Sequence, residues 1–351
     1  MSSKKVVIGL SGGVDSSTAA YLLKKDGYDV TAVTVLNFDG GEEAAQDAAK
    51  VAQYLSINHI ILDYKKNFKE KIKDMFVNEY LSGRTPNPCL ICNREVKWGA
   101  LMEIKNQIGA DYIATGHYAR VVKYAPTGRL AVKMSDDITK DQTYILSYLT
   151  QQQLMCTIFP LGGYTKKQVR EIAENAGIMT SQKPDSQEIC FIPDKDYAAF
   201  IQNYTGKKSI SGNYVDMQGH IIGQHKGIIH YTIGQRKGLG VSFGKHMFVN
   251  SINADKNEIV LGSNEELFKK EVYADKVNFM AVESIKEPLR AEAKIRYAHK
   301  KAPCTVYGME NGFIKCVFDE PQRAAAPGQA VVVYDGDYCL LSGIIENNPN
   351  N

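Results

Sequence analysis

Two cysteines in different parts of the chain could carry out sulfur chemistry, and the first of them lies in an unusual segment. Cys92 forms a Cys-x-x-Cys pair with Cys89 in residues 83–93, where two prolines separated by one residue keep the backbone extended. Asn93 is a good N-cap for a following helix, so the sequence places Cys92 just ahead of a helix N-terminus. That location lowers a thiol pKa from its free value of about 8.5 and favours the thiolate, which is the nucleophile.

Three other interpretations of the Cys-x-x-Cys pair remain open. Half of a zinc site would need a second ligand pair, and no further Cys-x-x-Cys or His-x₃-His occurs in the sequence. A thioredoxin-like redox pair would follow a strand directly rather than a proline-stiffened loop, and the two thiols could also be incidental. The second candidate, Cys190, lies in an apolar part of residues 183–193, where a lone cysteine is usually a small core residue.

A glycine-rich turn near the N-terminus could bind phosphate. A short apolar run at residues 6–10 is typical of a buried strand, and apolar residues at helical spacing follow from Asp15 until Gly27. Between them, residues 11–16 read Ser-Gly-Gly-Val-Asp-Ser. A strand, a turn and a helix in this order direct backbone N–H groups and the positive helix end at one point. The run is neither a Walker A loop nor a dinucleotide-binding turn, and on spacing alone it could be an ordinary tight turn.

Strands alternate with helices in the N-terminal half of the sequence. The pattern predicts strands over 29–35, 59–62 and 111–115 and helices over 42–55 and 68–80. This order is typical of a doubly wound parallel sheet, whose ligands bind at the carboxyl ends of the strands. The glycine-rich turn and residues 115–118, which read Thr-Gly-His-Tyr, both follow such ends. His117 could contact phosphate or RNA there, or it could be a satisfied histidine at a strand end.

The sequence after about residue 205 favours β structure. Frequent glycines between residues 206 and 244 disfavour long helices. From about residue 270, alternating strands are separated by hairpin turns such as Asn311-Gly312, which is typical of a small antiparallel barrel or sandwich. We therefore expect an α/β domain over 1–205, a small β-rich central domain over 206–268 and a C-terminal antiparallel β-barrel over 269–351.

Composition and charge exclude several classes of protein. Of the 351 residues, 44% are apolar and 23% are charged, as in ordinary globular proteins. No apolar run approaches the ~20 residues of a membrane span, and we find no signal peptide, so we expect a cytoplasmic protein without membrane contact. Seven cysteines without framework spacing are then expected to be reduced. The net charge of +3 does not by itself indicate nucleic-acid binding, so any RNA surface must be local.

Several motifs together resemble a known enzyme family. Residues 11–16 resemble the signature of the PP-loop ATP pyrophosphatases, which cleave ATP between the α and β phosphates. Over nearly its whole length the chain resembles the bacterial tRNA-specific 2-thiouridylases, with matching motifs in the same order. The matches lie at residues 11–17, 83–93, 115–118, 140–142, 185–191 and 231–240, and more weakly at 296–297 and 327–329.

This family makes 2-thiouridine at the wobble position of tRNAs for Lys, Glu and Gln, and the resemblance implies a role for each matching residue. ATP, with Mg²⁺, would be bound by Gly9, Leu10, Ser11, Gly12, Gly13, Val14, Asp15, Ser16, Val35 and Gly116. The target base would face Asn87, Pro88 and Cys89. Contacts with tRNA would come from His117, Lys140, Asp141, Gln142, Arg296, Tyr297 and Gln329, although Asp141 could equally be only a helix cap. Asp15 would belong to the catalytic residues, Cys190 would carry a persulfide and Cys92 would be the nucleophile.

The chemistry that the resemblance implies has three steps. Adenylation of the uracil 2-oxygen turns a poor leaving group into AMP. Cys190 would receive sulfane sulfur from a cysteine desulfurase or a relay protein, and its persulfide would attack the activated carbon. Cys92 would then release the product and form a disulfide with Cys190, which a reductant must reset. The base would be flipped out of the anticodon loop, where it is unpaired.

The sequence departs from the family pattern in two places. Many relatives carry Asp where Cys89 stands, so Cys89 could be a spare thiol or a metal ligand. After Val35 the sequence reads Leu-Asn-Phe-Asp, whereas many relatives have Lys-Asn-Trp and a longer insert. An alternative mechanism is therefore a tRNA thiolase with an iron–sulfur cluster on Cys89, Cys92 and Cys190. Another adenylating PP-loop ligase of small molecules and a non-catalytic RNA-binding module are further alternatives.

Overall fold

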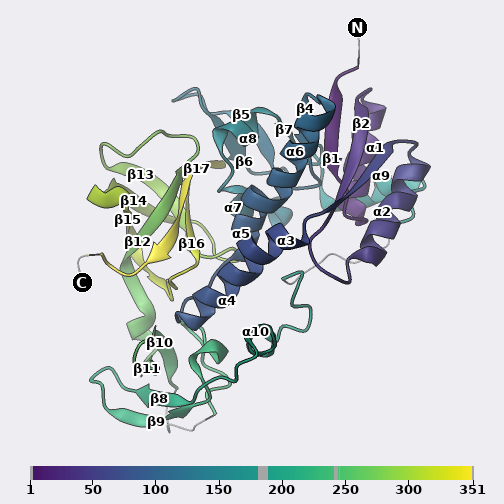
Figure 1. Ribbon diagram of the computed structural model, residues 1–351. Helices are drawn as coiled ribbons and strands as arrows, with labels where there is room; N and C mark the ends of the chain where they lie inside the picture. The colour runs from purple at the N-terminus through teal and green to yellow at the C-terminus, as the bar shows by residue number, and fades with distance from the viewer. Residues whose placement is uncertain (1–2, 181–188, 241–243, 245, 350–351) are drawn as a thin grey trace.

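The computed structural model describes residues 3–180, 189–240, 244 and 246–349. Three β-sheets organise this part of the chain, and helices pack mainly against the first of them (Figure 1). No helix among the described residues is long and apolar enough to cross a membrane.

The N-terminal sheet is parallel and has the strand order β3-β2-β1-β4-β7. Its strands are β1 (Lys5–Gly9), β2 (Asp29–Leu36), β3 (Asn58–Asp63), β4 (Tyr112–Ala114) and β7 (Thr157–Ile158). The helices that cover its two faces are α1 (Val14–Lys25), α2 (Glu42–Tyr54), α6 (Trp98–Ile108) and α9 (Lys166–Asn175). Val6 and Ile8 of β1 pack with α1, α2 and α9, whereas Val7 packs with α6 on the other face. The doubly wound parallel sheet expected from the sequence is confirmed.

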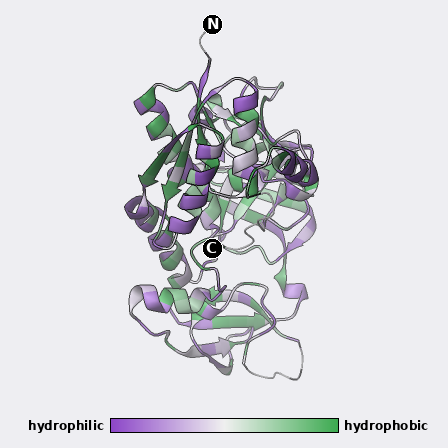
Figure 2. Cartoon of the chain, turned by 90° about the vertical axis from the view of Figure 1, so that its right-hand side faces the viewer, coloured by the Kyte–Doolittle hydropathy of each residue, from purple (hydrophilic) through white to green (hydrophobic). Residues whose placement is uncertain are grey.

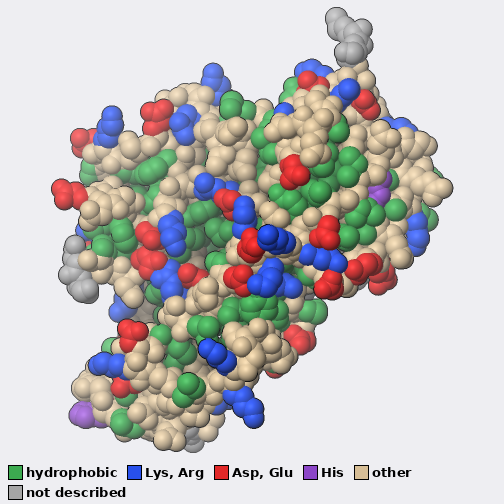
Figure 3. Space-filling model, in the orientation of Figure 1, with side chains coloured by type: hydrophobic (Ala, Val, Ile, Leu, Met, Phe, Trp, Pro, Cys, Tyr) green, Lys and Arg blue, Asp and Glu red, His purple; other side chains and the backbone are tan. Residues whose placement is uncertain are grey.

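Two long helical segments lie between β3 and β4. The first consists of α3 (Lys65–Phe68), a π-helical turn (Lys69–Lys73) and α4 (Asp74–Leu81). The second consists of α5 (Pro88–Ile91), a π-helical turn (Cys92–Lys97) and α6. Figure 3 shows positive and negative side chains interspersed over this part of the surface. Several of these charges pair within the first segment or with the second, as in Lys69–Asp74 and Lys71–Glu95, so they do not form a purely basic patch.

The second helical segment begins earlier than the sequence predicted. Asn87, not Asn93, is the N-cap, because its side-chain oxygen accepts a hydrogen bond from the N–H of Cys89 at 3.2 Å. Pro88 occupies the first helical position, where a missing N–H costs nothing. Cys92 therefore lies inside the helix rather than ahead of its N-terminus.

A four-stranded sheet forms the central region, with the order β10-β11-β8-β9. Its strands are β8 (Gly212–Val215), β9 (Ile221–His225), β10 (Phe248–Asn253) and β11 (Glu258–Gly262), and α10 (Tyr197–Thr205) precedes them. Tyr214, Val249 and Ile259 are fully buried in a core that this sheet shares with Ala324 and Ala326 from the C-terminal region. The β-rich central domain is confirmed.

The C-terminal strands close into an antiparallel barrel, because β12 pairs with both β15 and β17. The strands are β12 (Phe268–Phe279), β13 (Leu289–Lys294), β14 (Ala302–Gly308), β15 (Ile314–Arg323), β16 (Ala330–Asp335) and β17 (Tyr338–Glu346). In Figure 2 hydrophobic residues are concentrated in the strands of the sheets, and one apolar core joins a face of the parallel sheet to the barrel. The barrel expected from the sequence is confirmed.

One hairpin joins the N-terminal region to the barrel. The strands β5 (Arg120–Lys123) and β6 (Leu130–Lys133) follow β4 in sequence, yet β6 pairs with β17 at Lys133 and Tyr338. Two short helices follow the hairpin, α7 (Thr143–Leu146) and α8 (Gln151–Met155). The sequence did not predict this sharing of strands between regions.

Candidate nucleotide and sulfur-transfer site

The glycine-rich turn lies at the carboxyl end of β1 and leads directly into α1. The N–H of Ser11 donates to the hydroxyl of Ser16 at 3.1 Å, and the hydroxyl of Ser17 donates to the carbonyl of Gly13 at 2.8 Å. These bonds hold the turn in shape without a ligand. Gly12 has φ +72°, and a Cβ there would lie 2.6 Å from the carbonyl oxygen of Ala44 in α2. Glycine is therefore required at this position by packing of the protein against itself.

Residues 115–118 meet the same turn, as the positions of their strand ends predicted. A Cβ on Gly116 would lie 2.6 Å from the backbone nitrogen of Ser16, so the end of β4 touches the first turn of α1. Val35 lies half-buried near the end of the adjacent strand β2. The predicted ATP-binding residues are thus gathered at one edge of the sheet, which is where ligands of such folds bind.

Asp15 is held by two partners. The hydroxyl of Tyr118 donates to one carboxylate oxygen at 2.7 Å, and the ammonium group of Lys166 lies 2.8 Å from both oxygens. Lys166 begins α9 and its side chain is largely buried. Sequence reasoning missed this lysine, which follows the N-cap Thr165 in an otherwise ordinary amphipathic helix. A largely buried ammonium group beside a phosphate-binding turn is well suited to neutralise phosphate charge.

His117 is buried, and its ring is held by neighbouring side chains. Its Nδ1 lies 2.7 Å from the hydroxyl of Thr115, and its ring packs against Trp98 and Phe159. Burial holds the pKa of this imidazole well below its usual value, and the charge of Lys97 acts in the same direction. The lowered pKa favours the neutral imidazole, and the contact of His117 with tRNA stays a prediction.

Cys92 is buried within the helix and is not a low-pKa thiol. Burial raises its pKa to about 12, and only Lys97 opposes that shift. The prediction of a lowered pKa is wrong, because the helix begins at Pro88 and Cys92 does not sit at its positive end. The turn over Cys92–Lys97 is π-helical, with the N–H of Trp98 bonded to the carbonyl of Asn93. Such a turn brings residues five apart onto the same side, which places Lys97 near Cys92.

Cys190 is exposed and lies within electrostatic range of Cys92, although the two are far apart in sequence. Partial burial of its thiol raises the pKa of Cys190, and the nearby Cys89 acts in the same direction. Charges on Cys190 and Cys89 add to the effect of burial in raising the pKa of Cys92. The neighbouring Phe191 anchors this segment, because its ring packs edge-on against Phe68 at 5.5 Å. Phe68 and Cys92 belong to the same apolar cluster. The structure therefore brings the two predicted sulfur-transfer cysteines into one neighbourhood; residues 185–188 of their motif lie outside the described residues.

The residues predicted to face the target base surround the start of α5. Asn87 is the helix cap, Pro88 is buried, and the thiol of Cys89 reaches solvent. In the described residues, no group of three or more His, Cys, Asp or Glu side chains is arranged to hold a metal ion. This arrangement gives the alternative iron–sulfur cluster on Cys89, Cys92 and Cys190 no support.

Most residues predicted to contact tRNA use their polar groups inside the protein. The side-chain oxygen of Gln142 accepts the N–H of Tyr118 at 2.9 Å, and Asp141 accepts the hydroxyl of Thr143 at 2.8 Å. Arg296 donates to the carbonyls of Ile233 and Ala324, which joins the barrel to the central sheet. Gln329 donates to the carbonyl of Thr85. Lys140 is half-buried and Tyr297 is 45% exposed, so the tRNA contacts of these two residues stay predictions compatible with their positions.

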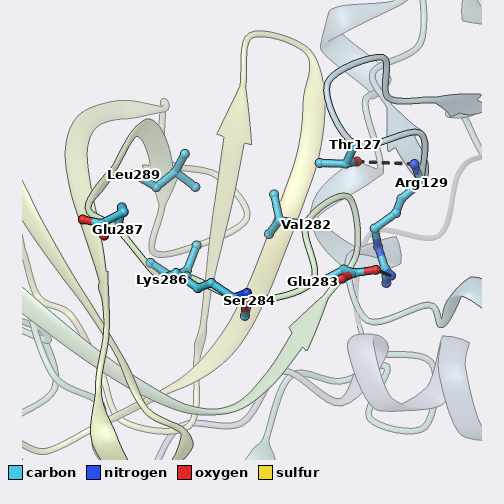
Figure 4. A pocket seen from close by; sticks show the side chains of 9 residues that line it. Thr127, Arg129, Val282, Glu283, Ser284, Lys286, Glu287 and Leu289 are labelled. Carbon is cyan, nitrogen blue, oxygen red and sulfur yellow. Dashed lines mark hydrogen bonds and ion pairs between the residues drawn. The ribbon is translucent and has the colours of Figure 1, made fainter.

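A pocket elsewhere contains none of these residues. It has a volume of about 490 Å³ and lies between the β5–β6 hairpin and the segment before β13 (Figure 4). Arg129 and Glu283 form an ion pair at its edge at 3.5 Å. Figure 4 shows its other side chains, Val282, Ser284, Lys286, Glu287 and Leu289, spread along an open rim rather than converging on one point.

Comparison with known proteins agrees with the geometry. Residues 4–194 match a family profile described as "tRNA methyl transferase HUP domain", residues 198–263 one described as a PRC-barrel domain, and residues 269–345 an aminomethyltransferase beta-barrel domain. The chain is 52% identical to the tRNA-specific 2-thiouridylase MnmA of Lachnoclostridium phytofermentans, over 97% of this chain and 99% of that protein. It is 51% identical to the protein of the same name from Clostridioides difficile, over 98% and 99%. The chain belongs to the tRNA-specific 2-thiouridylase family. The thiouridylases from Clostridium acetobutylicum and Acetivibrio thermocellus are 47% and 45% identical to it over almost their entire lengths.

Proposed function

We propose that this protein is a sulfurtransferase that uses ATP to convert a uridine of tRNA to 2-thiouridine. One observation carries the proposal: a phosphate-binding turn with a largely buried lysine stands at one end of the sheet, and the same domain holds Cys92 and Cys190 within electrostatic range of each other. Membership of the thiouridylase family supports the same activity. The wobble position of tRNAs for Lys, Glu and Gln is the expected target.

The first half of the reaction takes place at the glycine-rich turn beside Asp15 and Lys166, which we call the nucleotide end. The 2-oxygen of the uracil attacks the α-phosphate of ATP, and pyrophosphate leaves. The backbone N–H groups of the glycine-rich turn and the ammonium group of Lys166 are positioned to bind the departing phosphates. Lys166 can exchange its carboxylate partner Asp15 for phosphate, so we place both residues in the ATP site. We expect Mg²⁺ to arrive with ATP.

The second half belongs to the cysteines. The terminal sulfur of a persulfide on Cys190 attacks the activated C2, and AMP leaves with the electron pair of the broken C–O bond. The Cys92 thiolate then attacks the inner sulfur of Cys190, which breaks the sulfur–sulfur bond and leaves thiouridine and a Cys92–Cys190 disulfide. A dithiol reductant supplies the two electrons that restore both thiols. Because burial raises the pKa of Cys92 to about 12, tRNA binding must change its surroundings before this step.

The exposure of Cys190 suits a thiol that is loaded by another protein. We propose a cysteine desulfurase or a sulfur-relay protein as the donor, and the cytoplasm, where tRNA is modified, as the place of reaction. We assign ATP binding and sulfur transfer to residues 1–205, and tRNA contact to the barrel over residues 269–351. Tyr297 would make the contact from the barrel, and Lys140 would add a contact from the N-terminal region. Residues 206–268 form the connecting central domain.

A nucleoside assay tests the proposal. The protein is incubated with unmodified tRNA, ATP, Mg²⁺, cysteine and a cysteine desulfurase, and the digested nucleosides are analysed by mass spectrometry. We expect 2-thiouridine that depends on ATP, and no 2-thiouridine from either Cys92→Ser or Cys190→Ser. Methylated uridine, or no modified uridine with an active desulfurase, would contradict the proposal.

The same assay separates the alternatives. A small-molecule ligase would release pyrophosphate with an acid or amine acceptor and would tolerate both cysteine substitutions. A cluster-dependent thiolase would contain iron after anaerobic purification and lose activity on exposure to oxygen. Thiolation by iron-free protein with a reductant supports the persulfide route.

A further inference from the structure

The C-terminal barrel is joined to the backbone that leads into the cysteine-bearing helix. The N–H of Thr85 donates to the carbonyl of Pro327 at 2.8 Å, and the side-chain amide of Gln329 donates to the carbonyl of Thr85 at 2.8 Å. Both backbone polar groups of Thr85 are therefore bonded to one turn of the barrel, residues 327–329. Only Pro86 and Asn87 separate Thr85 from the first residue of α5.

An ion pair beside Thr85 joins the same two parts. The guanidinium of Arg84 forms a bidentate ion pair with the carboxylate of Glu346, which lies at the end of β17. Nη2 of Arg84 and Oε1 of Glu346 are 2.5 Å apart. Its Nε donates to Glu79 of α4 at 2.6 Å. All three side chains are mostly buried, with exposures of 19% to 22%. A bidentate pair of this kind fixes the relative orientation of the two side chains as well as their distance. A lysine at position 84 would act as a point charge and would not fix the orientation.

The approach of the two parts leaves no space for a side chain. Gly328 has φ +90°, and a Cβ there would lie 3.0 Å from the backbone nitrogen of Thr85 and 3.1 Å from a carboxylate oxygen of Glu79. The turn at residues 327–329 therefore needs glycine both for its backbone conformation and for its contact with the cysteine-bearing segment.

We propose that the turn at residues 327–329, together with Arg84 and Glu346, acts as a latch by which the barrel sets the position of Cys89 and Cys92. The segment between the latch and the helix is stiff, because Pro86 and Pro88 fix their backbones and Asn87 caps the helix. A displacement at Thr85 is therefore passed to the cysteines rather than absorbed. Gln329 is then a positioning residue that acts through Thr85, and not only a surface residue for tRNA.

The latch lies beside a core that the two parts share, in which Leu90 of α5 packs with barrel residues such as Val332 and Cys339. The barrel also closes through β12 and β17 and buries apolar residues of its own, and the other face of the parallel sheet has a core without barrel residues. Because these cores remain when the latch is lost, its loss should loosen the segment around Cys89 and Cys92 and leave the domains folded. Arg290 and Asp319 provide a matched control, since they form a two-pronged pair within the barrel, away from the cysteines.

Cysteine labelling in the full-length protein tests this directly. Arg84→Met and Arg290→Met are each treated with iodoacetamide at pH 8.5, and labelling of each cysteine is followed by peptide mass spectrometry. We expect the buried Cys92 to label about tenfold faster in Arg84→Met than in wild type, and at an unchanged rate in Arg290→Met, whereas the exposed Cys89 reports labelling that needs no opening. Cys304 and Cys316 are buried in the barrel's own core and report global unfolding. Equal labelling in the two variants overturns the latch. If the barrel cysteines also label, Gln329→Ala decides by the same criterion, since it removes a single hydrogen bond.

A second test measures the rate of thiolation and rests on the proposed function. At saturating tRNA and ATP, we expect Arg84→Met to lower the rate of thiolation at least about tenfold, because misplacement of a reacting group slows the step that it carries out. Its Kd for tRNA should stay within about threefold of wild type, and Arg84→Lys should recover part of the rate. Weaker tRNA binding by Gln329→Ala with unchanged cysteine labelling would instead make Gln329 a tRNA contact and overturn the proposal. If wild type does not thiolate tRNA, the proposed function fails while the labelling test still stands.

Discussion

The nucleotide end and the sulfur end of the N-terminal domain are prepared to different degrees. At the nucleotide end, the hydroxyl groups of the glycine-rich turn bond within the turn, and Asp15 is bonded to Tyr118 and Lys166. At the predicted sulfur-transfer end, burial raises the pKa of both thiols, although Cys92 is buried and Cys190 is exposed. The predicted ATP site thus has its internal contacts in place, whereas the predicted sulfur-transfer thiols are protonated at neutral pH.

This difference indicates how the order of steps could be enforced. A thiolate at Cys92 would attack any persulfide on Cys190 as soon as it formed and discharge its sulfur without a substrate. A buried, protonated Cys92 avoids that loss until the base is adenylated. The raised pKa is thus consistent with protection of the loaded enzyme in the absence of tRNA.

Removing either thiol should have the largest effect on activity. It should abolish sulfur transfer without abolishing the reaction of ATP. In Cys190→Ser and Cys92→Ser we expect thiolation to disappear, while tRNA-dependent release of pyrophosphate from ATP continues. Radiolabelled ATP and nucleoside analysis of the same reactions measure both quantities. Loss of pyrophosphate release along with thiolation would show that the two ends are not independent.

Lys166→Met should instead impair the reaction of ATP at the nucleotide end. We expect a fall of about 100-fold in the rate of pyrophosphate release, because the variant lacks a buried cation that binds phosphate charge. Iodoacetamide labelling of Cys89, Cys92 and Cys190 should stay as in wild type. Lys167→Met is the control. Lys167 is exposed, and among the described residues it forms an ion pair with Glu171 of the same helix. Equal loss in both lysine variants would contradict this assignment.

The pH dependence of labelling should separate the thiols themselves. Because the pKa of Cys92 is about 12, its rate of alkylation should rise about tenfold per pH unit from pH 8 to 10 without levelling off. The exposed Cys190 should label first. Lys97→Met should slow Cys92 further, since this lysine lowers the pKa of Cys92. A plateau for Cys92 below pH 9 would show that its thiol is already activated in the free protein.

His117 should have the smallest effect, on stability rather than on chemistry. Its pKa is lowered in the folded protein, so the unfolded chain takes up a proton first as the pH falls below about 6.5. Stability is therefore lost towards low pH, by at most about 1 kcal/mol between pH 6.5 and 5.5. The free energy of unfolding of wild type should fall more steeply over this range than that of His117→Gln. Parallel curves would mean that the buried imidazole accepts a proton in the folded state.

The sequence predicted the layers of the fold because local patterns carried that information. Alternating strands and helices indicated the parallel sheet, and strand ends indicated that Gly116 would meet the glycine-rich turn. The start of the cysteine-bearing helix was placed wrongly, because the capping preference of Asn93 indicated a start there, whereas Asn87 caps the helix in the structure. Proline at the first helical position was the signal that could have decided between them.

Other parts of the site depend on contacts that no local pattern reveals. Lys166 lies far from Asp15 in sequence, in a helix whose charged residues otherwise resemble a solvated face. Arg296, Gln142 and Gln329 match family motifs, and a match does not distinguish a residue that binds RNA from one that bonds within the protein. Their partners, such as Ile233 and Thr85, come from other regions of the chain.

The β5–β6 hairpin has a consequence for how the chain can be divided. Since β6 pairs with β17, a fragment that stops before the barrel would present an uncovered strand edge, which favours aggregation. A barrel fragment expressed alone would keep both β12 and β16 beside β17 and would lose only the contact of β6 at Tyr338. The N-terminal fragment should therefore be the less soluble half, and co-expression with the barrel should raise its soluble yield.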